Sequence, residues 1–387
     1  MDMPQSEMKA ILAWLERRSD DIVGLTGELV RMESPSTNPQ GLNRLAQFLA
    51  TQFEALGGTV HWHRRSEAGD HLQVEFQGNS PAEAKPVLLL GHHDTVWEMG
   101  TLQTMPWRID KKRMRGPGVY DMKAGIAQMI FALRALQEVR QGPRRPVNAL
   151  LVSDEEVGSH SSRNVTEALA KKSAAVLVLE PGQGAKGALK TARKGVGEFT
   201  VRVTGRAAHA GVDFGGGASA ILELARQMVA MEKFINLKRG ITVNPGVIRG
   251  GTRSNVIAAE AEALVDVRIA RAQHAGSIER KFRKRKPFDR QCKLRVEGGI
   301  NRPPLERSAA VVNLFSKAKI IAGQLGWNLE EAATGGGSDG NFTAALGIPT
   351  LDGLGAVGEG AHAIHEAVVI SEMPRRTALL ACLIETV

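Results

Sequence analysis

Two patterns of apolar residues divide the chain into regions with different predicted structure. Up to about residue 193, continuous apolar runs alternate with segments whose apolar residues recur at helical spacing. Buried strands separated by helices are typical of an α/β domain with a mostly parallel central sheet. The predicted strands are 71–76, 87–90, 147–152 and 174–179, and the first should be half-buried because its residues alternate. The predicted helices are 1–21, 41–56 and 123–139.

The pattern changes near Arg193. Strict alternation predicts strands around Phe199 and at 241–248 and 261–269, with a helix at 218–231. This is typical of a small antiparallel sheet with helices on one face. The first pattern then returns, with a helix at 308–325, a strand at 348–351 and a helix from Glu372. We therefore expect an α+β domain, residues 194–303, inserted into an α/β domain formed by residues 1–193 and 304–387.

Length and composition agree with a globular protein of two domains. The chain has 387 residues, of which 43% are hydrophobic and 24% charged. No apolar run is long enough to cross a bilayer, and residues 1–21 lack the apolar core and cleavage site of a signal peptide. Cys292 and Cys382 are far apart, which suggests reduced thiols. We therefore expect a cytoplasmic protein without a membrane partner.

The formal charge of +9 admits three partners: nucleic acid, an anionic membrane surface or an acidic small substrate. The densest basic run is 280–286, which alone would support a nucleic-acid-binding protein. Aromatic residues make up only 4%, and no helix-turn-helix or zinc-finger spacing occurs. We interpret the run as a solvated helix face or loop and expect no nucleic-acid partner.

The strand at 87–90 stops at Gly91 and is followed by His92, His93 and Asp94. Neighbouring strand residues point to opposite faces, so His92 and Asp94 share one side and His93 does not. His92 is then either an ordinary polar residue at the end of a strand or a metal ligand whose ring Asp94 orients.

Other strands and one loop also end in acidic residues. Glu155 and Glu156 follow the strand at 147–152, Glu180 follows that at 174–179, and Asp121 precedes a helix. Each alone has an ordinary explanation: a solvated turn, a loop acid or a helix N-cap. Together, however, they would meet at the carboxyl edge of the sheet, where ligand sites of α/β proteins lie. Carboxylates brought together there would repel each other, and two divalent cations would remove that cost.

A series of motifs in fixed order resembles the dinuclear zinc metallopeptidases, a family that includes glutamate carboxypeptidases, aminoacylases and acetylornithine deacetylases. The resemblance covers nearly the whole chain from about Leu25. The motifs are 91–96, 116–125, 154–159, 205–211, 254–257, 266–268, 335–340 and 360–362.

The resemblance implies a zinc-exopeptidase-like catalytic domain with an inserted dimerisation, or lid, domain. It implies two Zn²⁺ ions per chain, with Co²⁺ or Mn²⁺ as possible replacements, and a cis peptide bond between Asp121 and Met122. Asp121 would bridge the two metals, and Glu155 would be the general base. The implied metal ligands are His92, Asp121, Glu156, Glu180 and His362.

Residues of the inserted domain would complete the site. By resemblance, His209 would stabilise the oxyanion in the active site of the partner subunit of a homodimer. Arg268 and Asn255 would bind a substrate carboxylate, with Arg302 a weaker candidate. The glycine run that contains Gly336 and Gly337 would offer backbone N–H groups to an anion. We also expect the strands at Phe199 and Ala261 to leave a sheet edge that the partner extends.

The leading interpretation is a glutamate carboxypeptidase-like exopeptidase that releases a C-terminal acidic residue from a small peptide or N-acyl amino acid. The main alternative is a deacylase for N-acyl amino acids such as acetylornithine. A third interpretation is a metal-dependent binding protein without catalysis. Retention of all five ligand positions and of Glu155 argues against the third.

Overall fold

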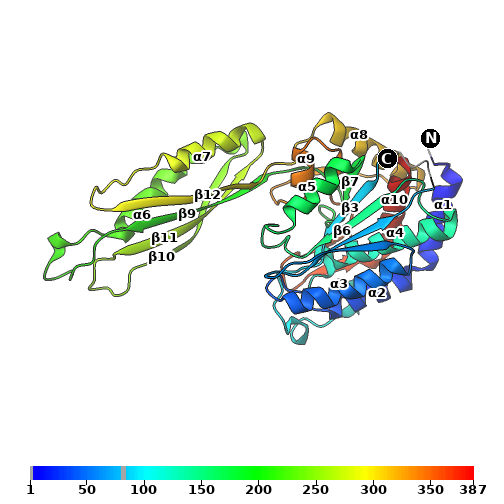
Figure 1. Ribbon diagram of the computed structural model, residues 1–387, viewed down its shortest axis with the longest axis horizontal. Helices are drawn as coiled ribbons and strands as arrows, with labels where there is room; N and C mark the ends of the chain where they lie inside the picture. The colour runs from blue at the N-terminus through cyan, green and yellow to red at the C-terminus, as the bar shows by residue number, and fades with distance from the viewer. Residues whose placement is uncertain (1–2, 80–83) are drawn as a thin grey trace. The chain divides into compact units, whose positions relative to one another are not determined.

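The computed structural model describes residues 3–79 and 84–387 and divides the chain into two compact units. The first unit comprises the residues up to 192 together with 307–334 and 338–387. The second comprises 193–306 and 335–337. In Figure 1 the second unit contains the green to yellow elements β9 to β12, α6 and α7, and the first unit contains the blue, cyan, orange and red elements together with the green α5 and β7. The catalytic and dimerising roles expected for these parts of the chain stay predictions.

A six-stranded sheet forms the centre of the first unit, in the order β1-β2-β6-β3-β7-β14. The pairings from β6 through β3 and β7 to β14 are parallel, whereas β1 with β2 and β2 with β6 are antiparallel. The strands are β1 (Thr59–His63), β2 (His71–Phe76), β3 (Val87–His92), β6 (Val147–Val152), β7 (Ala175–Val178) and β14 (Thr350–Leu351). The expected mostly parallel sheet is confirmed.

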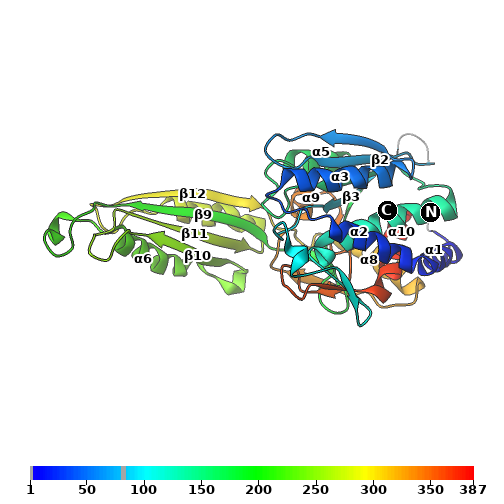
Figure 2. The same ribbon diagram turned by 90° about the horizontal axis from the view of Figure 1, so that it is seen from below.

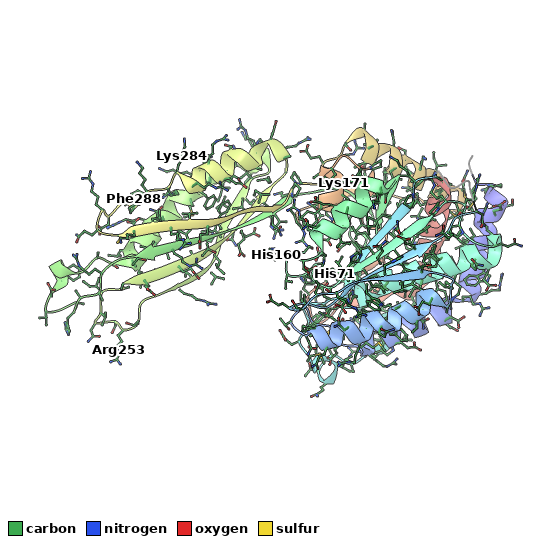
Figure 3. The ribbon with its side chains drawn as sticks, viewed as in Figure 1. His71, His160, Lys171, Arg253, Lys284 and Phe288 are labelled. Carbon is green, nitrogen blue, oxygen red and sulfur yellow. The ribbon has the colours of Figure 1, made fainter. Side chains whose placement is uncertain are left out.

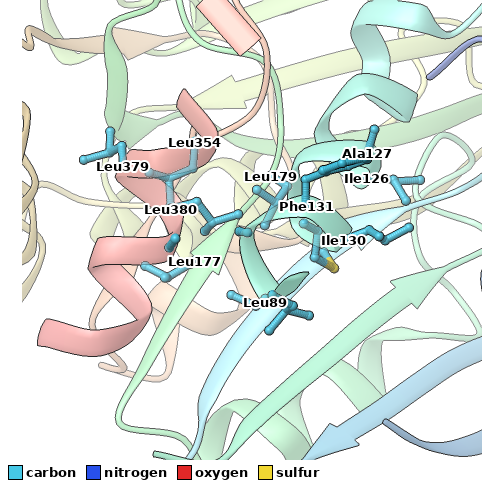
Figure 4. Packing of buried hydrophobic residues seen from close by; sticks show 14 of the residues in the cluster. Leu89, Ile126, Ala127, Ile130, Phe131, Leu177, Leu179, Leu354, Leu379 and Leu380 are labelled. Carbon is cyan, nitrogen blue, oxygen red and sulfur yellow. The ribbon is translucent and has the colours of Figure 1, made fainter. Parts of the chain in front are cut away.

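Helices cover both faces of this sheet. Side chains from α4 and α10 pack on one face with Leu89 and Leu177, as Figure 4 shows. Leu169 of α5 packs on the other face with Leu88 and Leu90. The helices of this unit are α1 (Gln5–Arg17), α2 (Ser19–Arg31), α3 (Pro39–Glu54), α4 (Ala124–Arg140), α5 (Arg163–Lys172), α8 (Ala309–Gln324), α9 (Gly340–Ala345) and α10 (Met373–Thr386).

Two smaller sheets complete the first unit. The four-stranded sheet has the order β15-β16-β5-β4, and the two-stranded sheet pairs β13 with β8. The strands are β4 (Arg108–Asp110), β5 (Arg113–Arg115), β8 (Leu189–Arg193), β13 (Glu331–Thr334), β15 (Gly358–Glu359) and β16 (Ala367–Val369).

Two local predictions for the first unit are wrong. Strand β2 is almost wholly buried instead of half-buried, because both of its faces are covered. Leu72, Val74 and Phe76 pack in the main hydrophobic cluster. On the other face, His71 and Gln73 are buried and hydrogen-bond with Ser153 and His63. The N-terminal segment forms two helices, since the chain leaves helical geometry at Arg18. Asp20 and Asp21 then stand in the first turn of α2, where acidic side chains stabilise a helix start. The first two residues lie outside the described part of the chain.

The second unit is a four-stranded antiparallel sheet in the order β10-β11-β9-β12. Its inward-facing residues, such as Phe199 and Val201, pack with Leu224 of α6 and Phe282 of α7. Helix α6 lies against one face of the sheet in Figure 2. The elements are β9 (Gly195–Thr204), β10 (Thr242–Gly250), β11 (Glu260–Ile269), β12 (Lys293–Arg302), α6 (Ala220–Met231) and α7 (Ala275–Arg283). The expected helix-covered antiparallel sheet is confirmed.

The expected position of the sheet edge is wrong. The strands that contain Phe199 and Ala261 are β9 and β11, and they are the two inner strands. Strand β12, which the sequence pattern did not predict, pairs with β9, while β10 pairs with the other side of β11. The free edges of this sheet are therefore those of β10 and β12.

Other sequence-based features can be located in the structure. None of the helices in the described part of the chain is long and apolar enough to span a membrane. Cys292 and Cys382 are both free thiols, and both are buried. The basic run at 280–286 occupies the end of α7 and the loop that follows. Lys284 and nearby Phe288 point outward there, and both are exposed (Figure 3).

Candidate metal centre and active site

Five chain segments carry the predicted ligands, and all belong to the first unit. His92 is the last residue of β3, Glu156 follows β6 and Glu180 follows β7. Because these strands are parallel, their carboxyl ends meet at one edge of the sheet. Asp121 lies in the kinked, non-helical segment just before α4, and His362 lies in the loop between β15 and β16.

The five side chains form two groups that share Asp121. In the first group, His92 Nε2 lies 3.2 Å from Asp121 Oδ1 and 3.4 Å from Glu180 Oε1. In the second, His362 Nε2 lies 3.4 Å from Asp121 Oδ2 and 3.3 Å from Glu156 Oε1. Each oxygen of Asp121 thus faces a different imidazole. Within each group the candidate ligand atoms lie within 4.8 Å of one another.

The electrostatics of the two groups favour a cation. The carboxylates of Asp121 and Glu156 raise the pKa of His362 to about 10. Burial lowers the pKa of His92, but bonds to carboxylates including Asp121 outweigh this effect and leave the pKa well above its ordinary value. Burial would raise the pKa of Asp121, yet His362 and His92 hold it far below its usual range. The carboxylates that raise the pKa of both imidazoles would equally attract a metal cation placed between them.

The spacing of these atoms also fits divalent metals. Ligand atoms around a tetrahedral Zn²⁺ with bonds of 2.0–2.2 Å are about 3.3–3.6 Å apart. The four distances of 3.2–3.4 Å are close to that range and longer than a good charge-assisted hydrogen bond. Within the described residues, the buried Oε1 of Glu156 accepts no well-formed hydrogen bond. The residues therefore fit a pair of metal ions.

Asp94 connects three parts of the site. Its carboxylate lies 3.4 Å from His92 Nδ1, and that ring nitrogen is 3.0 Å from the backbone oxygen of Asp94. The same carboxylate accepts the backbone N–H groups of Glu155 and Glu156 at 3.3 and 3.1 Å. It also accepts the Ser36 hydroxyl at 2.7 Å. Asp94 therefore orients the imidazole and also fixes the turn that carries both glutamates.

Strand alternation separates the two adjacent histidines. His93 points away from the five side chains and is fully buried. Neither of its ring nitrogens has a hydrogen-bond partner among the described residues. Burial lowers the pKa of His93 to about 4, so the ring is neutral. The cis peptide bond expected between Asp121 and Met122 is confirmed.

Sequence reasoning missed Ser36 and Glu366. The buried carboxylate of Glu366 accepts N–H groups from Trp97, Gly118, Tyr120 and Asp121. Burial raises the pKa of Glu366 to about 7, against the lowering effect of its three backbone donors. The sequence offered no signal for either residue, because each acts through contacts distant in the chain.

Four of the predicted substrate-binding residues gather at one end of the second unit. Arg268 and Arg302 both pair with Val196, from opposite sides, so their side chains share a face of the sheet. Arg268 forms a two-pronged contact with Asp266 and approaches the backbone oxygen of Gly335 at 3.4 Å. The remaining two are Gly336 and Gly337, whose carbonyls accept from Arg193.

His209 and Asn255 lie beyond the other end of the same sheet. His209 forms a β-bridge with Val256, and the neighbouring Ala210 N–H donates to the Asn255 backbone oxygen at 2.9 Å. Both residues are exposed. Strand β9, which separates this end from Val196, has 10 residues and therefore spans about 30 Å. One copy of the second unit cannot bring His209 and Arg268 to the same small substrate.

Comparison with known proteins agrees with this geometry. The pattern of peptidase family M20/M25/M40 matches residues 88–386. This chain belongs to that family. Carboxypeptidase G2 of Pseudomonas sp. (strain RS-16) is 30% identical over 365 residues, which cover 92% of this chain and 87% of that protein. The predicted family is thus confirmed, and with it the prediction of a hydrolase of the metallopeptidase and carboxypeptidase type.

Solved structures show the same fold in other members. Aminopeptidase PepT of Bacillus cereus is 23% identical with a TM-score of 0.77, covering 95% of this chain and 98% of that chain. A dinuclear metal-binding peptidase of the M20 family from Bacillus subtilis is 14% identical with a TM-score of 0.69, covering 96% and 98%. The M20 peptidase fold therefore extends over almost the whole chain.

Proposed function

We propose that this M20 family protein is a carboxypeptidase with two metal ions, which releases a C-terminal acidic amino acid, glutamate or a similar residue, from a small peptide or N-acyl amino acid. The observation that carries the proposal is the pair of ligand groups joined by Asp121, with Glu155 next to Glu156. Two oxygens of one carboxylate, each facing its own imidazole, suit a bridge between two cations.

In this proposal His92, Asp121 and Glu180 hold one metal, and Asp121, Glu156 and His362 hold the other. Zn²⁺ is the expected ion because the donors are imidazoles and carboxylates, and Co²⁺ or Mn²⁺ would suit the same set. When bound, the cations would polarise the scissile carbonyl and lower the pKa of a water molecule.

Glu155 is the proposed general base. It would take a proton from the attacking water and return it to the nitrogen of the leaving amino acid. Asp94 holds Glu155 at its backbone N–H, so the base and the ligand Glu156 are positioned by the same carboxylate. Glu155 thus works as a base while its neighbour Glu156 serves as a ligand.

Substrate recognition would use residues of the second unit. We propose that Arg268, Arg302 and the backbone of the segment with Gly336 and Gly337 bind the α-carboxylate of the amino acid that is released. Support comes from their common position at one end of the sheet and from the relative carboxypeptidase G2, whose name states a carboxypeptidase.

His209 and Asn255 would act across a homodimer, because they lie at the opposite end of the sheet from Arg268. The proposed dimer surface consists of the free edge of β10 and helix α6. Leu222 and Val229 of α6 are 55% and 70% exposed, and Ile248 of β10 is 52% exposed. Pairing of two β10 edges would cover these side chains and the open strand.

A substrate panel tests this proposal. Protein stripped with a chelator and reloaded with Zn²⁺ should cleave N-acyl-glutamate and dipeptides that end in glutamate. The matched control is the α-amide of the same N-acyl-glutamate, which lacks the α-carboxylate and should lose about 100-fold or more in kcat/KM, because the amide cannot form the charge-assisted hydrogen bonds that Arg268 and Arg302 would make to the free acid. The stripped protein should be inactive. Preference for N-acetylornithine would favour the deacylase instead, and binding without turnover of any substrate would favour a binding protein.

The cytoplasmic location stays a prediction.

A further inference from the structure

Glu366 gathers more directed N–H donors than its place on a surface loop would require. It directly precedes β16, and its carboxylate is buried. Oε1 accepts the backbone N–H groups of Tyr120 at 2.7 Å and Asp121 at 3.0 Å. Oε2 accepts the Gly118 N–H at 2.9 Å and the indole N–H of Trp97 at 2.8 Å. Each oxygen therefore receives two donors.

This arrangement suits only a group that accepts at both ends. An ionised carboxylate offers about four lone-pair sites and carries no hydrogen, so it matches four donors. A glutamine side chain in the same place would turn an NH₂ group toward two N–H groups. Hydrogen bonds to an ionised acceptor are also the stronger ones in proteins. The surroundings of this side chain thus require an acceptor at both oxygens, although it belongs to neither group of candidate ligands.

The four donors come from segments that carry the metal ligands. Trp97 lies a few residues beyond His92, at the exit of β3. Asp121 is the residue shared by the two ligand groups, and Glu366 holds its backbone directly. Glu366 is itself in the loop of His362. One buried carboxylate therefore connects three of the segments that must keep a fixed distance for two ligand groups to form.

The backbone at Gly118 is built for this contact. Gly118 has a φ of +70°, which side chains rarely adopt. A Cβ at this position would lie 2.5 Å from Thr95 Cγ2. Glycine therefore lets the segment before Asp121 pass close to the exit of β3 while its N–H points at Glu366.

We infer that Glu366 is a positioning residue for the metal centre: its carboxylate, through four N–H donors, fixes the backbone of Asp121 relative to the loop of His362 and the exit of β3. The inference rests on the proposed function. Glu366 would touch neither the substrate nor a metal. Its loss would loosen Asp121, so the protein would bind metal less tightly and turn over more slowly, while substrate binding by residues of the second unit would change little.

The test compares Glu366→Gln with wild-type protein and with Glu359→Gln. Glu359 is the last residue of β15, which pairs with β16, and it contacts Arg113 of β5 on the surface, so it controls for loss of a glutamate that joins two strands. Metal-free proteins are titrated with Co²⁺ by calorimetry, and the visible spectrum of the bound ion is recorded. Supporting residues around metal ligands typically contribute about 10–100-fold in affinity or activity. We expect Glu366→Gln to lose affinity and kcat within that range, with an altered Co²⁺ spectrum and KM within about twofold. Glu359→Gln should resemble wild type.

A lower melting temperature with unchanged metal affinity, spectrum and kcat would show a purely structural role and overturn the inference. If Glu366→Gln does not fold, the metal affinity, Co²⁺ spectrum, kcat and KM of Glu366→Asp are compared with those of the wild type instead. The shorter side chain of aspartate keeps the carboxylate but cannot reach all four donors. Failure of the wild-type protein itself to bind metal would contradict the proposed function and not this inference alone.

Discussion

Two neighbouring glutamates illustrate how the surroundings set the role of a residue in this protein. Glu156 points an oxygen at His362, 3.3 Å away, and burial raises its pKa. Glu155 precedes it in the same turn, and its backbone is held by Asp94. A ligand must face the metals permanently, whereas a base must exchange a proton with water and then with the leaving nitrogen. The two roles can therefore be separated by substitution.

We predict that Glu155→Gln keeps both metals and loses several orders of magnitude in kcat, because only proton transfer is removed while shape is kept. Metal content by elemental analysis and kcat on N-acyl-glutamate are the two measurements. Glu156→Gln is the matched comparison, and it should lose metal as well as activity. Near-normal turnover of Glu155→Gln with full metal content would exclude the proposed base.

At the residue scale, the sequence could identify what local rules control. Strand alternation correctly separated His92 from His93, because period-two geometry depends only on neighbours. The expected meeting of acidic residues from strand ends and from the loop before α4 is seen for Asp121 and Glu180, which lie in one group with His92. Glu366 could not be predicted, since its four donors lie about 245–270 positions earlier in the chain and no local pattern marks such contacts.

At the scale of elements, short apolar runs were assigned well, because a continuous apolar run of that length suits a strand covered on both faces. Strands β3 and β6 therefore lie where they were expected. Strand β12 escaped prediction, because Gly298 and Gly299 interrupt its apolar alternation. Gly298 has a φ of +99° and lies so near Glu198 that a Cβ would be 2.1 Å from its backbone oxygen.

The missed strand changed a conclusion about the whole sheet. Without β12, the sequence predicts the strand of Phe199 at an edge, whereas the structure places it inside. The order of strands in a sheet is set by long-range pairing and cannot be inferred from the alternation within each strand. The proposed dimer edge therefore moves to β10, which is free along one side.

At the scale of the whole molecule, the second unit places two sets of candidate residues at opposite ends of one sheet. Arg268 pairs with Val196 near the start of β9, and His209 lies beyond its end. About 30 Å of strand separates them. If both serve the same reaction, the substrate must meet residues from two copies of the chain, and a single chain has an incomplete site.

Subunit mixing tests this assembly. We predict that His209→Ala and Glu155→Gln are each inactive alone and regain activity when mixed under conditions that allow exchange. A mixed dimer contains one complete site, made of Glu155 from one chain and His209 from the other. Random exchange gives about half mixed dimers, so recovery should approach about a quarter of wild-type activity. No recovery despite proven exchange would mean that His209 acts within its own chain or has no role.

The central claim is a pair of metal ions bridged by Asp121, and X-ray diffraction on either side of the zinc absorption edge tests it most directly. Crystals of protein stripped with a chelator and reloaded with Zn²⁺ should give two anomalous peaks per chain. One peak should lie among His92, Asp121 and Glu180, and the other among Asp121, Glu156 and His362, where the candidate ligand atoms already converge. No peak at these side chains in fully reloaded, active protein would contradict the account.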